Sequence, residues 1–98
     1  MAVNTSPFDV AEHLRTDEEA LLYLEAAFEE GGDDAVFIAR AVGTVARARG
    51  MTQTASAAGL SRESLYKALS GERSPDFSTM LKVMRALGMR LRPQAASA

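Results

Sequence analysis

The sequence predicts an all-α protein, a single domain of about five helices that includes a helix-turn-helix. Three observations support this fold class. Apolar residues recur at spacings of three and four, as on the buried face of a helix. Capping residues and glycines divide the chain into segments of helical length. The clearest pattern is at residues 51–71, MTQTASAAGLSRESLYKALSG, where a glycine separates two short helical segments.

The first long helix is expected at residues 17–30. Thr16 and Glu19 match a capping box, in which each side chain accepts a backbone N–H from the other residue. The apolar stripe of this helix has three large members at helical spacing, Leu21, Leu24 and Phe28, and is widened by Ala20 and Ala27. Two glycines end the helix at 31–32. A shorter apolar pattern at residues 8–14 indicates a further turn or short helix in front of it.

A second long helix is expected at residues 35–49, capped by Asp33 or Asp34. Gly50 follows at the position where helices commonly end on glycine. The core-facing positions of this helix are all apolar: Ile38, Ala41, Val42 and Val45.

The helix-turn-helix comes next. Thr52 is a good N-cap for its first helix, and Ser61 for its second. Gly59 lies between them, where a sharp turn requires a positive φ, and Leu60 is expected to anchor the turn in the core. The second helix has a polar outer face and three inward residues: Leu65, Ala68 and Leu69. An apolar back and a polar front are what a helix that reads the major groove needs.

After a loop, a last helix is expected at residues 77–87, with Asp76 as its N-cap and Gly88 just beyond its end. Its apolar stripe comprises Phe77, Met80, Leu81, Met84 and Leu87. Residues 89–92 then alternate apolar and basic side chains, a pattern typical of a short strand. The tail, residues 93–98, is expected to be disordered.

Charge is divided between the two parts of the chain. Residues 1–35 carry ten acidic side chains and one arginine, a net charge of −9, whereas residues 36–98 carry ten basic and three acidic side chains, a net charge of +7. The basic part can approach phosphate, and the acidic part should attract a basic surface. Alternatively, these charges only solvate helical surfaces. We therefore expect one domain, 1–98, divided into an acidic helical extension, 1–33, and a helix-turn-helix core, 34–92.

The composition excludes several classes of protein. Hydrophobic residues make up 47% of the chain, enough for a folded core. The absence of cysteine excludes disulfides and thiolate metal sites and fits a reducing cytoplasm. No signal-peptide pattern and no apolar run of the roughly 20 residues that span a bilayer are visible. His13 is the only histidine, and no phosphate-binding glycine loop is present. We expect a cytoplasmic protein without enzyme activity, cofactor, metal, membrane partner or small-molecule substrate.

The helix-turn-helix predicts contacts with DNA. Arg62 can bond guanine in bidentate fashion, and Glu63 can accept from cytosine N4. Gln53, at the start of the first helix, is expected to anchor a phosphate. The other candidates for base or backbone contacts are Ser61, Ser64, Tyr66 and Lys67, and those for phosphate contacts are Arg47 and Arg73. The alternative is that these side chains only cap and solvate their helices.

One reading helix covers only a few base pairs, so we expect a homodimer that binds two half-sites. The candidate interface is Met84, Leu87, Met89 and Leu91, with the terminal strand paired to its copy across a two-fold axis. These residues could equally complete the core of the monomer.

The run GMTQTASAAGLSRESLYKALSGERSPDFSTMLKVMRALGMRL resembles the addiction-module antidote proteins, which are HigA-like antitoxins with a lambda-repressor-like (XRE-type) helix-turn-helix. The resemblance covers residues 8–91, and the segment 59–71 is its most specific part. The upstream acidic segment, FDVAEHLRTDEEALLYLEAAFEEGGD, follows the same order of features. Thr54 and Ser56 depart from it, because bulkier residues are frequent at these positions.

The resemblance implies an antitoxin that neutralises a basic toxin of the RelE/ParE superfamily and represses their shared operon. Combined with the charge division, it places the toxin contacts on the acidic helix: Leu21, Leu24, Glu25, Phe28 and Glu29. The apolar members of this set could instead pack on the protein's own core. Two other functions stay open, a transcriptional regulator without a toxin partner and an interaction module that no longer binds DNA.

Overall fold

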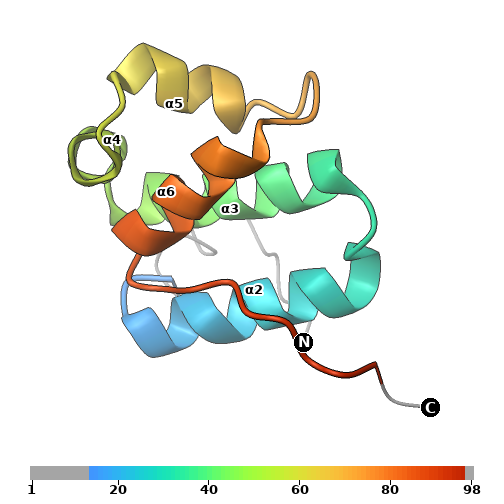
Figure 1. Ribbon diagram of the computed structural model, residues 1–98. Helices are drawn as coiled ribbons and strands as arrows, with labels where there is room; N and C mark the ends of the chain where they lie inside the picture. Colours follow the sequence, from blue (N-terminus) through green and yellow to red (C-terminus); the bar gives the residue numbers. More distant parts are fainter. Residues whose placement is uncertain (1–13, 97–98) are drawn as a thin grey trace, which may run out of the picture.

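The computed structural model describes residues 14–96, and this part of the chain forms five α-helices and no strand (Figure 1). The helices are α2 (Asp17–Gly31), α3 (Ala35–Arg49), α4 (Met51–Ala58), α5 (Arg62–Ala68) and α6 (Phe77–Ala86). The predicted all-α fold class is therefore confirmed. The short helix expected at residues 8–14 lies, apart from Leu14, outside the described residues.

The five helices surround one core. Helix α3 packs against α2 and α4, and α4 packs in turn against α5 and α6. In Figure 1, α5 lies at the top of the molecule and α2 at the bottom, with α3 and α6 between them. The largest fully buried side chains come from every helix except α4: Leu24, Leu65, Leu69, Val42, Val45 and Val83. The core thus holds α5 and α2 on opposite sides of the molecule.

The predicted caps of α2 and α3 are confirmed. The Thr16 hydroxyl accepts from the Glu19 N–H at 3.1 Å, and the Glu19 carboxylate accepts from the Thr16 N–H at 3.3 Å. Asp34, rather than Asp33, caps α3, because its carboxylate accepts two N–H groups in the first turn of that helix. Arg49 then joins the two helices through an ion pair with Asp17 at 2.6 Å.

The start of α4 differs from the prediction. Its N-cap is Gly50 with φ 109°, and Thr52 provides no cap. Gly50 caps both the end of α3 and the start of α4. Helix α4 therefore starts two residues earlier than it would with Thr52 as its N-cap. The polar Thr54 is buried, but its hydroxyl donates to the Gly50 carbonyl at 2.8 Å. This small polar residue therefore packs in α4 without leaving a hydrogen-bonding group unsatisfied.

The turn between α4 and α5 follows the prediction. Gly59 has φ 71°, in the left-handed region, and its N–H caps the end of α4. Leu60 is partly buried against the core, as expected for the residue that anchors the turn. The Ser61 hydroxyl accepts from the Ser64 N–H at 3.0 Å and caps α5. The direction of α5 relative to the core is set by these three residues.

The predicted apolar stripes of α2 and α6 are only partly buried. Leu24 is buried, but Leu21 and Phe28 are 45% and 39% exposed, because the face of α2 that meets α3 carries Ala20, Leu24 and Ala27. Phe77, the first residue of α6, is 70% exposed. Helical spacing showed which residues share a face, but not how much of that face another element covers.

The prediction of a strand at residues 89–92 is wrong. Gly88, with φ 83°, turns the chain after α6, and the Met89 N–H bonds back to the Met84 carbonyl at 2.9 Å. The chain then runs without regular structure beside α2 (Figure 1), since the described residues offer no strand for it to pair with. Of the candidate dimer interface, Met84 and Leu87 are buried in the monomer core. In the described residues, no helix is long and apolar enough to cross a membrane.

Candidate nucleic-acid interface and partner groove

The outer face of α5 is polar and exposed. Leu65 is fully buried and fixes the inner face of this seven-residue helix to the core. All six candidates that the sequence placed at this helix are exposed: Ser61, Arg62, Glu63, Ser64, Tyr66 and Lys67. The structure therefore brings these candidates together on one exposed surface.

Arg62 and Tyr66 form a pair on this face. They are four residues apart, and the guanidinium carbon lies 5.3 Å from the centre of the tyrosine ring. The Arg62 Nη2 also donates to the Tyr66 hydroxyl at 3.3 Å. The ring and the hydroxyl hold the guanidinium along the helix surface, while its other N–H groups stay available to a ligand.

Ser61 and Ser64 are engaged with each other. Besides accepting the Ser64 N–H, the Ser61 hydroxyl donates to the Ser64 hydroxyl at 2.9 Å. These two hydroxyls therefore maintain the cap of α5, which makes Arg62, Glu63 and Lys67 the more available ligand-binding groups on this face.

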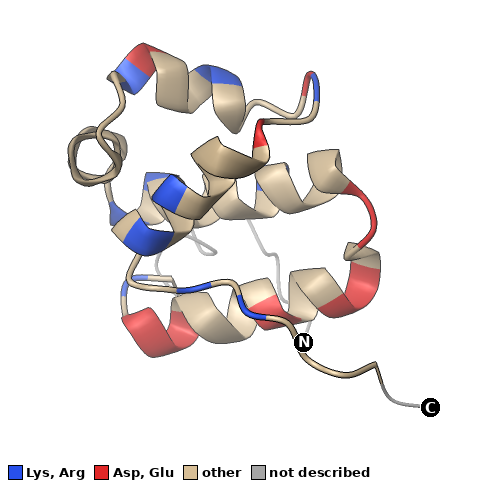
Figure 2. Ribbon diagram, in the orientation of Figure 1, with Lys and Arg blue, Asp and Glu red and all other residues tan. Residues whose placement is uncertain are grey.

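The remaining DNA candidates lie on neighbouring elements and are all exposed. Gln53 is in the first turn of α4, Arg47 is near the end of α3, and Arg73 is in the loop after α5. Two exposed basic residues of α6 were not among the candidates, Lys82 and Arg85. Figure 2 shows lysine and arginine positions on α3, α5, α6 and the segment after α6, whereas aspartate and glutamate positions are concentrated on α2 and the turn that follows it.

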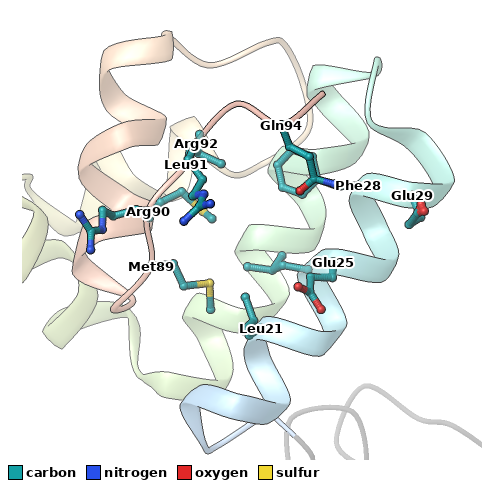
Figure 3. A pocket seen from close by; sticks show the side chains of 11 residues that line it. Leu21, Glu25, Phe28, Glu29, Met89, Arg90, Leu91, Arg92 and Gln94 are labelled. Atoms are coloured by element: carbon teal, nitrogen blue, oxygen red, sulfur yellow. The ribbon is translucent and has the colours of Figure 1, made fainter. Parts of the chain in front are cut away.

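The opposite side of the molecule contains an open groove of about 910 Å³ between α2 and the segment after α6 (Figure 3). All five candidates for toxin contacts line its α2 wall: Leu21, Leu24, Glu25, Phe28 and Glu29. Leu24 is 2% exposed and belongs to the core at the base of the groove. The other residues around the groove come from α6 and the chain after it: Met84, Met89, Arg90, Leu91, Arg92 and Gln94. The sequence assigned three residues of this second wall, Met84, Met89 and Leu91, to a candidate dimer interface and not to a toxin site, because residues 89–92 were expected to pair as a strand with a second copy.

A smaller hollow adjoins the groove at the end of α2 and shares Phe28 and Glu29 with it. Its acidic lining residues are Glu29, Glu30, Asp33 and Asp34. Helix α2 has no basic residue in its last turn, so Glu29 and Glu30 face the negative end of the helix dipole unopposed within that turn. A positively charged partner would relieve this unfavourable arrangement. Across residues 14–96, no group of three or more His, Cys, Asp or Glu side chains is placed to hold a metal ion.

Comparisons with known proteins indicate the family of this chain. A family described as probable addiction module antidote protein matches residues 4–95. A protein of Haemophilus influenzae, described only as uncharacterized, is 49% identical over 94 residues, which cover 96% of this chain and 95% of the relative. No solved structure matches the chain at a significant level.

Proposed function

The chain belongs to the family of probable addiction module antidote proteins, and we propose that it is a cytoplasmic, HigA-like antitoxin with two binding activities and no enzymatic one. It neutralises a basic toxin of the RelE/ParE superfamily. As a homodimer, it also binds operator DNA and represses the operon that encodes both proteins.

Operator binding is supported above all by the exposed polar face of α5. Arg62 is held by Tyr66 on this face, and Leu65 fixes the helix to the core. The face also lies on the opposite side of the molecule from the acidic helix α2, which phosphate would repel (Figure 2). Gln53, Arg47 and Arg73 on neighbouring elements can then contact the phosphate backbone.

Titration of the full chain against a labelled duplex from its own promoter, followed by fluorescence anisotropy, tests operator binding. We expect tighter binding than to a scrambled duplex, and an affinity that falls steeply as salt rises, because phosphate contacts release counterions. Equal affinity for the two duplexes, or no binding to either, would remove the repressor function from the proposal.

Toxin binding is supported by the acidic surface of α2. Reversal of Glu25 and Glu29 to lysine is expected to slow association with the toxin by about tenfold or more, because long-range attraction to a basic protein is lost. Operator binding should be unchanged, since these residues lie far from α5. Kinetics on immobilised product of the reading frame adjoining this chain's gene would measure the effect.

The matched control reverses two carboxylates on the other side of the molecule. Glu63 lies in α5 and Glu72 in the following loop, and both are exposed. Reversing this pair changes the net charge by the same amount. If both pairs slow association equally, the attraction comes from net charge alone and not from α2.

A further inference from the structure

We propose that the groove between α2 and residues 89–94 is the toxin-docking site, and that it accepts an extended toxin segment bearing apolar side chains and lysine or arginine. This inference rests on the proposed function, because it takes the partner to be a toxin. It adds a second wall, the C-terminal segment (residues 89–94), to a site that the sequence assigned to α2 alone.

Apolar side chains are exposed on both walls of the groove. Leu21 and Phe28 on α2 are 45% and 39% exposed, and Leu91 on the C-terminal segment is 38% exposed. Figure 3 shows the two α2 residues along one side and Leu91 on the other. Single exposed leucines are ordinary, but several that line one concave surface are typical of a binding site. A partner segment could bury all three at once.

Within the described residues, the backbone of the C-terminal segment is unpaired. From Arg90 to Gln94, no backbone N–H or carbonyl makes a hydrogen bond to another described residue. The alternation of apolar and basic residues at 89–92 is a strand pattern, although residues 14–96 contain no strand with which it could pair. An extended segment of a partner can supply the missing strand, with main-chain hydrogen bonds providing affinity and alternate side chains entering the groove.

The charged residues around the groove favour a basic partner over a second copy of this chain. The groove itself is lined by two carboxylates on α2, Glu25 and Glu29, and by Arg90 and Arg92 on the other wall. The adjoining hollow adds the carboxylates of Glu30, Asp33 and Asp34, the last of which caps α3. In Figure 3 the Arg90 side chain extends away from α2. A second copy that docked its own α2 surface here would bring the same carboxylates together, which is unfavourable. Lysine or arginine on a toxin segment would instead lie beside the carboxylates of α2.

The test compares two exposed phenylalanines. Phe28 lines the groove, whereas Phe77, at the start of α6, is 70% exposed and does not. Calorimetric titration of the full chain with the purified product of the adjoining reading frame should show affinity reduced about tenfold or more by Phe28→Ala. Phe77→Ala should change it by less than about twofold. Leu91→Ala, on the other wall, should act like Phe28→Ala. Circular dichroism confirms that each variant is folded.

Each outcome has a distinct meaning. If wild type binds the toxin and neither Phe28→Ala nor Leu91→Ala weakens binding, the groove is not the site, although the proposed function stands. If wild type fails to bind, the proposed function itself is wrong. If the groove variants dissociate a homodimer and leave toxin affinity unchanged, the groove holds a second copy and our assignment is overturned.

Discussion

Replacement of Leu65 by alanine is expected to lower the free energy of unfolding by about 2–5 kcal/mol, the usual cost of a large cavity in a core. Leu65 is fully buried and is the inward anchor of α5. A helix of seven residues is too short to be stable alone, so its conformation depends on this contact. Small domains are stable by only about 5–15 kcal/mol, so operator binding should weaken together with stability.

Urea unfolding of the full chain, followed by circular dichroism, measures this loss. Leu22→Ala is the control, because Leu22 is 62% exposed on α2 and its truncation should change stability by less than about 0.5 kcal/mol. A loss for Leu65→Ala as small as that of the control would mean that α5 is not anchored to the core in the way described here.

Replacement of Arg62 by alanine is expected to reduce the preference for operator over scrambled DNA by about 1–3 kcal/mol, the value of one bidentate base contact. Tyr66 already holds the guanidinium on the exposed face of α5, so less side-chain entropy is lost when it binds a base. Stability should hardly change, since both side chains are exposed. Anisotropy titrations with the two duplexes give the preference directly.

Arg73 offers the matched comparison. It is an exposed arginine in the loop after α5, and we expect it to contact phosphate. Arg73→Ala should therefore weaken binding to both duplexes by a similar factor and reduce the salt dependence. If Arg62→Ala also weakens both duplexes equally, Arg62 binds the backbone and does not read a base.

The helix boundaries were largely predictable because local chemistry determines them. The capping box of Thr16 and Glu19, the Asp34 cap and the positive φ of Gly59 each follow from short-range geometry. The predicted start of α4 is wrong, because Gly50 both ends α3 and begins α4. Thr52 is therefore not needed as a cap. Capping preferences rank residues, but they do not show which of two neighbouring positions the core will select.

The sites were less predictable than the helices. Helical spacing grouped Leu21, Leu24 and Phe28, yet only Leu24 is buried, because burial depends on which element packs against α2. The strand pattern at residues 89–92 failed because a strand needs a partner that the described chain does not provide. The groove arises only when α2 and the C-terminal segment are placed side by side, which no local pattern reveals. The DNA contacts assigned to α5 stay predictions.

We propose that DNA and toxin bind on opposite sides of the molecule. Backbone amide NMR of the isotopically labelled full chain, titrated with the promoter duplex, tests it most directly. We expect the largest shift changes at residues 62–67 of α5, and none at residues 21–29 of α2. Shift changes concentrated on α2, with α5 unaffected, would contradict the account.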